Sequence, residues 1–417
     1  MRTILVVGAG QSGLQLALGL LAEDYDVTLV NPDGPEEIRA GRVTSTQCLF
    51  GPALRRERRH GLSLWEDRAP QIRGVGLRVA PREGDAPGPS WLGRLEEPAR
   101  SVDQRLKLSA WLDLFVRGGG RLIRHRVRPA ELPGLAAEYE LVVVAAGRGG
   151  LAEVFPRNTA RSRYDAPQRS LALVYASGAD PHPDGPALSR TAVPGAGEVF
   201  SLPVLSLNGP CDALMVEAVP RGPLDDPLPA TAHAGDVLDR VLRVVRRHAP
   251  WEYERFAGAR PADPMAALTG GYAPAVREPV ARPGGGAPVL GMADTVVAND
   301  PITAQGANMA SLAADVYRRA IVDHGTRPFD EHFMRGAFAE YWRRARQVTA
   351  WSRVMLSGPP HVWELYRLAA RHQGTADRFA NSFADPTGLI EWFLHPERAL
   401  EYIDGLSRPA PVGGRSR

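Results

Sequence analysis

Hydrophobic residues at the start of the chain follow first a strand period and then a helix period. The run from Ile4 to Val7 is continuously apolar, and after a glycine-rich turn the apolar positions recur at helical spacing. A second apolar run follows, from Asp26 to Val30. This order predicts a strand, a helix that begins near Gln11 and a second strand, which together form a β-α-β unit.

The remaining pattern predicts more α/β structure, then a sheet, then helices. A helix is predicted at about 102–117 and a central strand at 139–146, with a surface loop before them at 81–89. Apolar and polar residues alternate between Pro/Gly turns over 168–219, which predicts a mostly antiparallel sheet. From about residue 329 onward the pattern is helical.

The turn after the first strand carries glycines in G-x-G-x-x-G spacing. Gly8 permits a tight turn, Gly10 lets the backbone approach a phosphate, and Gly13 allows the helix to pack closely on the strand. The first N–H groups of the helix, at Gln11 and Ser12, then face the negative charge of a pyrophosphate. The spacing predicts a dinucleotide site, and the alternative is a purely structural turn.

The end of the second strand departs from the usual dinucleotide pattern. This position normally offers Asp or Glu to the ribose hydroxyls, and here the chain has Asn31. An asparagine can still form a hydrogen bond with a ribose, but without a charge. We therefore expect a cofactor that exchanges, or one that other segments hold.

Composition narrows the function classes. The chain has 417 residues, 44% of them hydrophobic, and a formal net charge of +3, and Lys107 is its only lysine. The two cysteines cannot build a disulfide framework, the ten histidines are scattered, and no apolar stretch approaches the ~18 residues of a membrane span. We expect a cytoplasmic protein of two or three lobes that binds no metal, nucleic acid or membrane.

A second segment favours FAD over NAD. Asp294, Pro301 and then the run 305–308 have the order of the GD motif in FAD-dependent monooxygenases. An acid at the end of a strand suits a ribityl hydroxyl, and a helix that opens near Gln305 offers N–H groups to the flavin pyrimidine ring. NAD would need neither. The alternative is that Asp294 is a loop or capping residue.

Over nearly its whole length, to about residue 360, the chain resembles the epoxidase component of styrene and indole monooxygenases. The segments that carry the resemblance are VGAGQSGL, PARSVDQRL, ELVVVAAGRGGLAEVF, PQRSLAL, SLPVLSLNG, GGYAPAVR and LGMADTVVANDPITAQGANMAS. The resemblance implies an α/β protein, with a Rossmann-like FAD-binding domain of the aromatic-hydroxylase type, an inserted β-sheet substrate domain and C-terminal helices.

We predict the domain boundaries from the patterns and the resemblance together. The FAD-binding domain is discontinuous, the substrate-binding domain is inserted into it, and a helical region and a short disordered tail follow. The FAD-binding domain is predicted at 1–60, 95–165 and 270–330, and the substrate-binding domain at 61–94 and 166–269. The helical region is predicted at 331–408 and the tail at 409–417.

The resemblance also implies an activity and a partner. In this family, FAD is reduced by a separate NADH-dependent flavin reductase, is captured as FADH2 and reacts with O2 to give a C4a-(hydro)peroxide. The oxygenase then epoxidises or hydroxylates an apolar or aromatic small molecule. The chemistry resides in the flavin, so the protein needs no catalytic triad and supplies a dry pocket. A homodimer is compatible with this interpretation.

One residue argument favours this two-component arrangement independently. Single-component aromatic hydroxylases carry G-A-D-G after the central strand, for both FAD and NAD(P)H, whereas this chain has Ala146, Gly147, Arg148 and Gly149. Arginine in place of the acid disfavours NAD(P)H binding. Two alternatives stay open, a single-component NAD(P)H-dependent hydroxylase and a non-catalytic flavin-binding redox protein. A halogenase is disfavoured because its W-x-W-x-I-P segment is absent.

The family's active-site loop corresponds to residues 42–47, where a family Asn aligns with Ser45. Hydroxyl groups at Thr44, Ser45 and Thr46 are candidates for orienting the reactive flavin, and the alternative is a capped polar turn. Asn308 is the fourth candidate catalytic residue. Arg42 and Arg105 are assigned to FAD phosphate or ring oxygens, or alternatively to ordinary ion pairs.

The complete candidate sites follow from these arguments. The predicted cofactor-binding residues are Gly8, Gly10, Gln11, Ser12, Gly13, Asn31, Arg42, Arg105, Gly147, Asp294, Pro301, Gln305, Gly306, Ala307, Asn308 and Met309. The substrate lining is expected among Val174, Leu202, Val204, Leu205, Leu207 and Met215, of which strand alternation turns only some inward.

Overall fold

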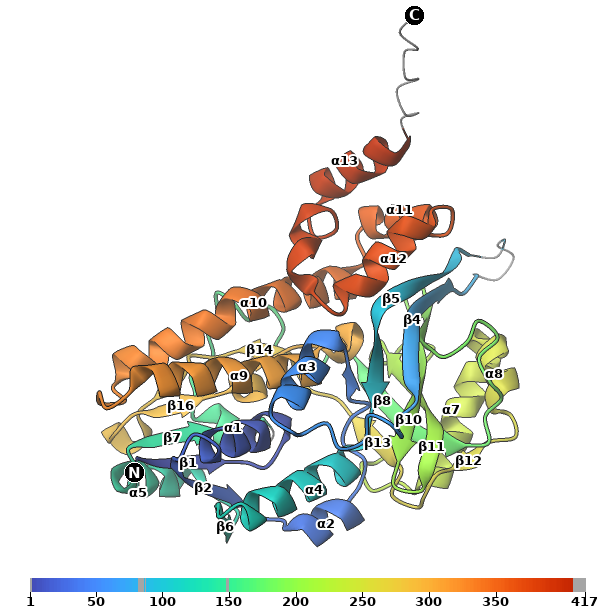
Figure 1. Cartoon of the computed structure of the whole chain (residues 1–417). Coiled ribbons are helices and arrows are strands. Elements are labelled where there is room, and N and C mark those ends of the chain that lie inside the picture. The colour runs from blue at the N-terminus through green and yellow to red at the C-terminus, as the bar shows by residue number, and fades with distance from the viewer. Residues whose placement is uncertain (1, 82–85, 87, 148–149, 408–417) are drawn as a thin grey trace, which may run out of the picture.

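The structure, a computed structural model, describes residues 2–81, 86, 88–147 and 150–407. Arg148, Gly149 and the predicted tail at 409–417 lie outside the described residues, as does most of the predicted loop at 81–89. Figure 1 shows the β-α-β unit at one side of the molecule, a second sheet at the other, and the C-terminal helices above both.

Among the described residues, a six-stranded sheet carries the N-terminal unit, in the order β15-β16-β7-β1-β2-β6. All neighbours are parallel except β15 and β16. The central strands are continuously apolar because both faces of the sheet are covered. The strands are β1 (Thr3–Val7), β2 (Asp26–Asn31), β6 (Arg121–Arg124), β7 (Leu141–Val144), β15 (Val280–Ala281) and β16 (Val289–Gly291).

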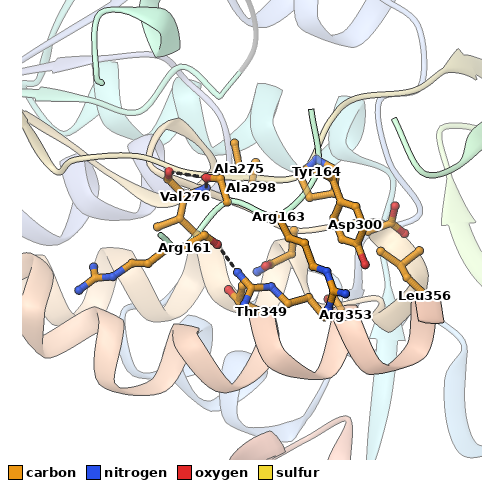
Figure 2. A pocket seen from close by; sticks show the side chains of 14 residues that line it. Arg161, Arg163, Tyr164, Ala275, Val276, Ala298, Asp300, Thr349, Arg353 and Leu356 are labelled. Atoms are coloured by element: carbon orange, nitrogen blue, oxygen red, sulfur yellow. Dashed lines mark hydrogen bonds between the residues drawn. The ribbon is translucent and has the colours of Figure 1, made fainter. Parts of the chain in front are cut away.

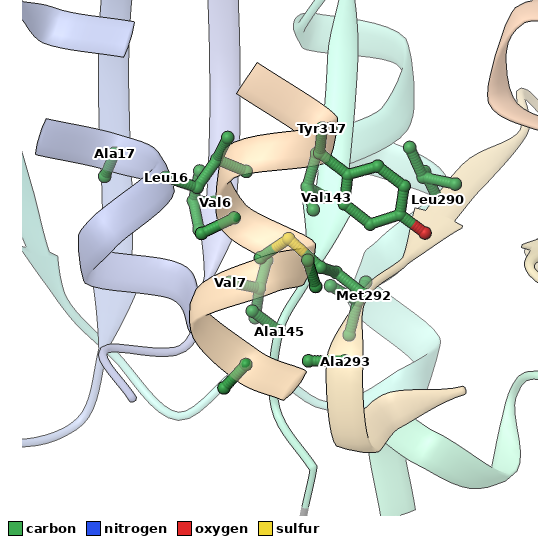
Figure 3. Close-up of a cluster of buried hydrophobic side chains, with 14 of the residues drawn as sticks. Val6, Val7, Leu16, Ala17, Val143, Ala145, Leu290, Met292, Ala293 and Tyr317 are labelled. Atoms are coloured by element: carbon green, nitrogen blue, oxygen red, sulfur yellow. The ribbon is translucent and has the colours of Figure 1, made fainter. Parts of the chain in front are cut away.

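Helices α1 (Gln11–Leu21) and α9 (Gly306–His324) pack together on this sheet. Figure 3 shows the core that they form, in which Val6, Leu16, Val143 and Met292 belong to one cluster with Tyr317. The Tyr317 hydroxyl donates to Gly291 O at 3.0 Å and so ties α9 to the end of β16. The first helix and the strands around it were predicted from the sequence pattern alone.

A nine-stranded sheet forms the second half, in the order β12-β8-β11-β10-β9-β4-β5-β3, with β13 paired to β8. Its neighbours are antiparallel except β4 and β9, which confirms the predicted mostly antiparallel sheet. The strands are β3 (Cys48–Leu49), β4 (Gln71–Val79), β5 (Ser90–Ser101), β8 (Ser170–Ser177), β9 (Ala187–Val193), β10 (Gly197–Ser206), β11 (Gly209–Ala218), β12 (Arg260–Pro261) and β13 (Ala267–Gly270).

This sheet reaches further into the chain than the predicted domain boundaries. The boundary between 94 and 95 falls inside β5, and β3 belongs to the sheet although 1–60 was assigned to the FAD-binding domain. The difference arises because β5 continues to Ser101 and pairs there with Cys48 of β3, and local pattern carries no signal for such a distant partner. A small separate sheet pairs β14 (Ala275–Val276) with β17 (Val297–Ala298).

The remaining helices cover the two sheets. α7 packs on the second sheet, while α12 lies against β5, where a Cβ on Gly93 would be only 2.0 Å from Ala376 O. The helices are α2 (Pro35–Ala40), α3 (Gly51–Arg59), α4 (Gln104–Arg117), α5 (Leu132–Glu138), α6 (Gly150–Glu153), α7 (Ala234–His248), α8 (Pro250–Phe256), α10 (Glu331–Ser357), α11 (Pro360–Ala369), α12 (Gln373–Ser382) and α13 (Pro396–Ser407). No helix in the described part of the chain combines the length and apolar character needed to cross a bilayer.

Candidate functional site

The glycine turn has the geometry of a phosphate cradle. Gly8 adopts φ +112°, and its N–H donates to Val30 O at 2.9 Å. A Cβ on Gly13 would lie 2.0 Å from Gly8 O, so the helix packs directly on the turn, whereas a Cβ on Gly10 would meet nothing within 4 Å. No side chain caps α1. The backbone at Gly10 and the first N–H groups of the helix therefore leave room for an anion.

Asn31 stabilises this turn. Its Oδ1 accepts a hydrogen bond from Ala9 N at 3.2 Å, and its Nδ2 donates to Asp33 O at 2.7 Å. One end of the amide thus holds the backbone of the glycine turn, and the other end holds the backbone just after β2. A hydrogen bond from Asn31 to the cofactor ribose stays a prediction.

Asp294 lies next to Gly147, although the two residues are far apart in the sequence. Strand β16 pairs with β7, and Gly291 faces Val144, so the segments that follow these strands leave the sheet together. A Cβ on Gly147 would be 2.6 Å from the Cβ of Asp294, and the carboxylate is exposed. Asp294 lies in the short 3-10 turn Ala293–Thr295 directly after β16. The structure therefore brings these two predicted cofactor residues together.

The segment from Asp300 to the start of α9 is a rigid, capped turn. Asp300 caps the 3-10 turn Pro301–Thr303 by accepting from Ile302 N at 3.2 Å, and Ala304 then adopts the left-handed conformation at φ 52°. Helix α9 begins at Gly306, where a Cβ would meet nothing within 4 Å. The N–H groups of Gly306 and Ala307, in the first turn of α9, have no partner within the helix and are therefore available to a ligand.

Asn308 and Gln305 use their amides to hold backbone. Asn308 Oδ1 accepts from Phe50 N at 3.0 Å, and its Nδ2 donates to Cys48 O at 2.9 Å and to Ala304 O at 3.2 Å. Gln305 Nε2 donates to Phe383 O at 2.9 Å. Both donor hydrogens of Asn308 are thus occupied, and its predicted catalytic role gains no geometric support. Met309 is buried in the core beside them.

The loop at 42–47 is tied to both halves of the molecule. Thr44 Oγ1 donates to Gln104 Oε1, at the start of α4. Ser45 O accepts from the buried Tyr175 hydroxyl of β8 at 2.6 Å, and Thr46 O accepts from the Ser101 hydroxyl. Ser45 Oγ also accepts from Gln47 N at 3.1 Å, which is the capped polar turn weighed as the alternative.

Arg105 joins the two halves through buried ion pairs. Its guanidinium donates to Asp103 and Asp263, with Nη2 to carboxylate distances of 2.7 and 2.8 Å, and only 3% of its side chain is exposed. Burial by itself lowers the pKa of Arg105, but the hydrogen bonds to the two carboxylates outweigh it and raise the pKa. Arg42 donates to Ala232 O. The structure thus gives Arg105 the ion-pair role, and a flavin contact by either arginine stays a prediction.

A buried polar network lies beneath the loop and was missed at the sequence level. Gln47 Nε2 donates to Gln11 Oε1 at 2.6 Å, Gln11 Nε2 donates to Glu57 Oε1 at 3.2 Å, and Lys107 Nζ donates to the same oxygen at 2.8 Å. All four side chains belong to residues at most 5% exposed. The only signal in the sequence was that Lys107 is the single lysine in a chain rich in arginine.

The inner face of the second sheet is apolar and packs on the same loop. Leu202, Val204 and Met215 share one core with Val43 of the loop and Ile302 of the capped turn. The other three predicted lining residues lie elsewhere. Val174 lies on the opposite face of the sheet, Leu205 belongs to the core of the six-stranded sheet, and the half-buried Leu207 follows the end of β10. Alternation along the strands thus selects half of the predicted lining.

Buried acids lie close to the capped turn. Glu217 of β11 is 0% exposed, and neither carboxylate oxygen has a hydrogen-bond partner. Its neighbour on β10, Glu198, pairs with Arg169 at 2.7 Å and with Arg190 at 3.3 Å. Burial raises the pKa of Glu217, and burial likewise raises the pKa of Asp300 to about 6.

Asp300 also lines a surface pocket of about 300 Å³ beside α10. Figure 2 shows Arg163 and Arg353 near one another in this pocket, with Tyr164 and Asp300 at one end and Arg161 turned away. Arg353 donates to Arg161 O, which fixes one guanidinium in the wall. The pocket thus touches the turn that leads into α9.

Known proteins similar to this chain are flavin enzymes. Residues 147–255 match the family model described as the styrene monooxygenase A putative substrate binding domain. Over 414 residues, the chain is 30% identical to styrene monooxygenase StyA from Pseudomonas fluorescens, and the match covers 96% of this chain and 97% of that protein.

Solved structures share the fold at low sequence identity. The flavin-dependent brominase Bmp2 has a TM-score of 0.68 at 13% identity, with 97% of this chain and 98% of the brominase covered. A flavoprotein/dehydrogenase from Cytophaga hutchinsonii also has a TM-score of 0.68, at 11% identity, with 97% of this chain and all of that chain (100%) covered. These likenesses confirm the predicted fold class.

The fold and the relatives together place the protein in the class of flavin-dependent monooxygenases. The sequence comparison also identifies the family within that class. With 30% identity to StyA along almost its whole length, the chain belongs to the styrene monooxygenase family, and the predicted resemblance is confirmed.

Proposed function

We propose that this protein is the oxygenase component of a two-component system. It captures FADH2 and uses O2 to epoxidise or hydroxylate an apolar or aromatic small molecule. The observation that carries the proposal is the close approach of Gly147 and Asp294. Gly147 follows β7, and β7 pairs with β1, the strand that ends at the glycine turn. The acid of the GD segment therefore lies near that turn. The family membership supports the same reaction class.

The residues present fit FAD. Gly10 leaves space for the pyrophosphate, the Asp294 carboxylate suits a ribityl hydroxyl, and the first N–H groups of α9 suit the pyrimidine ring. When bound in its reduced form, the flavin supplies the activation of O2. The chain's own residues bind and orient the cofactor, and no acid–base pair is needed for the oxygen transfer.

The substrate class follows from the inner face of the second sheet. Leu202, Val204 and Met215 face the loop at 42–47 and the capped turn across an apolar core. Such a surface excludes water and favours an apolar or aromatic molecule. A reaction that leaves a reactive oxygen donor exposed to water would waste it as peroxide, so a dry wall also protects the chemistry.

The reductant is proposed to come from a separate NADH-dependent flavin reductase, which meets the oxygenase transiently. Arginine at position 148, where single-component hydroxylases carry an acid, supports this proposal, as does the uncharged Asn31 at the ribose position. An FAD held without the ribose acid exchanges more readily, as delivery from another protein requires.

The decisive experiment mixes purified protein with FAD, NADH, O2 and styrene or indole as probe substrates. We expect negligible NADH oxidation by the protein alone, and oxygenated product once an NADH-dependent flavin reductase is added. Chemically reduced FAD without any reductase should support a single turnover. Robust NAD(P)H consumption by the chain alone would refute the two-component proposal. Formation of peroxide, with no oxygenated product from any substrate tested, would favour a redox protein.

The flavin role of Asp294 is tested by substitution. Asp294→Ala should weaken binding of FAD and FADH2 about tenfold, because a charge-assisted hydrogen bond is lost. Affinity is measured by flavin fluorescence under anaerobic conditions. Asp113→Ala, which removes an exposed acid on α4, is the matched control and should leave affinity unchanged. An equal affinity for wild type and Asp294→Ala would refute the assigned role.

A further inference from the structure

The buried network under the loop has a fixed direction. Glu57 presents a carboxylate, which accepts hydrogen bonds, and the Lys107 ammonium donates to it. Gln11 therefore has to present its Nε2 to Glu57, so that its Oε1 faces Gln47. Gln47 in turn presents Nε2 to Gln11. The buried carboxylate thereby fixes the orientation of both amides.

The outer end of this network is an acceptor without a donor. Gln47 is only 2% exposed, and its Oε1 has no hydrogen-bond partner. A buried amide oxygen without a partner destabilises the protein by about 1–3 kcal/mol. The amide cannot reverse to relieve this, because its N–H groups would then be turned away from the Gln11 oxygen. Such an atom marks a place where a ligand that carries a donor completes the structure.

The position of Gln47 indicates which ligand this is. Through Gln11 it contacts the first residue of α1, the helix assigned to the pyrophosphate. The next residue, Cys48, accepts a hydrogen bond from Asn308 in the first turn of α9, the helix assigned to the pyrimidine ring. The part of FAD that connects pyrophosphate and ring system is the ribityl chain, and its hydroxyl groups are hydrogen-bond donors.

We propose that Gln47 is a positioning residue for the flavin and that its Oε1 accepts a hydrogen bond from a ribityl hydroxyl. This inference rests on the proposed function, since it requires FAD in the predicted site. It assigns the Gln11–Glu57–Lys107 network the task of holding that acceptor in place. Gln47 carries φ +43°, so the loop backbone is also held in a sparsely populated conformation at this residue.

The test compares FAD with ADP, which lacks the ribityl chain and ring system. Gln47→Leu should weaken FAD binding about three- to tenfold, the range for one hydrogen bond, and leave ADP binding unchanged. FAD analogues that each lack one ribityl hydroxyl sharpen the test. For the analogue that lacks the contacted hydroxyl, wild type and Gln47→Leu should bind equally. Calorimetry measures all these affinities without turnover.

Gln15→Leu is the matched control, because Gln15 is a buried amide that meets the same network without contacting Gln47. Its Oε1 accepts from Gln11 Nε2 at 3.1 Å, and its Nε2 donates to Ser311 Oγ at 3.2 Å. It should not distinguish FAD from ADP. If Gln47→Leu does not fold, Gln47→Asn, which withdraws the amide by one methylene, replaces it with the same expectation. Equal losses for FAD and ADP, or an unchanged FAD affinity, would overturn the inference while leaving the proposed function standing. A wild-type protein that binds no FAD would overturn both.

Discussion

Helices α1 and α9 both begin at the predicted flavin site, and their first turns are built differently. At α1 no side chain caps the helix, and a Cβ on Gly10 would meet open space. At α9 the first turn is surrounded by side-chain amides, and Asn308 alone makes three hydrogen bonds to backbone. The first helix offers bare backbone, whereas the second is fixed in position by the residues around it.

In the proposed function, the difference reflects what each helix terminus has to recognise. A pyrophosphate is a compact anion that any set of converging N–H groups can bind, so bare backbone suffices at α1. A flat ring has to be held in one orientation relative to the substrate, so the turn that meets it has to be rigid. Asp300 and Asn308 supply that rigidity on either side of Ala304.

The largest effect is expected from Gly13→Ala. The added Cβ would lie 2.0 Å from Gly8 O, which is backbone and cannot move aside without displacing α1 from β1. We expect a loss of about 4 kcal/mol or more in the free energy of unfolding, or no folded protein. Urea denaturation followed by circular dichroism measures this loss. A stable Gly13→Ala variant would show that the turn is looser than the structure indicates.

Gly10→Ala tests the effect of the glycine turn on FAD affinity separately from its effect on protein stability. The new Cβ would meet nothing within 4 Å, and Gly10 has an ordinary extended conformation, so stability should change by less than about 0.5 kcal/mol. FAD affinity should nevertheless fall, because the methyl group occupies space left for the pyrophosphate. Unchanged affinity for both FAD and ADP would place the phosphates elsewhere.

Asn308→Ala should have the next largest effect and should act on stability. Three hydrogen bonds to backbone are lost, and Phe50 N is left buried without an acceptor, so we expect a loss of about 2–3 kcal/mol. Asn208→Ala is the control, because this exposed amide donates only to Ala262 O. If Asn308→Ala instead kept full stability and lost only turnover, Asn308 would be catalytic, as the sequence suggested.

Glu217→Gln tests the buried acids next to the capped turn. A carboxyl whose pKa is raised on folding is stabilising when protonated, and that stability is lost as pH rises above the unfolded pKa of about 4.3. Glutamine stays neutral, so the variant should be more stable than wild type by about 1 kcal/mol at pH 7 and equal to it near pH 4. Urea denaturation across this range measures the difference, and a gap independent of pH would contradict the assignment.

A smaller pH effect is expected from Asp300. Its pKa is raised from 3.8 to about 6, so its contribution to stability should decline as pH rises between these values. Asp300→Asn keeps the cap acceptor for Ile302 N and removes the titration. The variant should therefore flatten the pH dependence of stability between about pH 4 and 6 without lowering stability at pH 7.

Local patterns were sufficient to predict the elements that carry the first half of the proposed site. The glycine turn, α1 and β2 follow from residues that contact their near neighbours in the sequence, and the order Asp294 to Asn308 predicted the second segment. Side-chain direction could not be predicted in this way. Arg105 fits a phosphate by type, but its partner Asp263 lies 158 residues further along the chain.

The same limit explains what was missed in the second sheet and in the buried network. Strand β4 contains two glycines and two arginines and shows no clean alternation, and its parallel partner is distant in the sequence. The amide network of Gln11 and Gln47 connects residues 36 apart through side chains that carry no motif. Such features depend on the packed structure and have no local signature.

The ion pairs of Arg105 have a kinetic consequence. Because one buried guanidinium holds Asp103 of the cofactor half and Asp263 near the second sheet, the two halves cannot separate about a hinge without breaking a desolvated charge pair. In the proposed function, flavin that arrives from outside therefore meets a site that is already assembled. Capture should proceed in a single second-order step whose rate follows the flavin concentration without reaching a plateau set by domain closure.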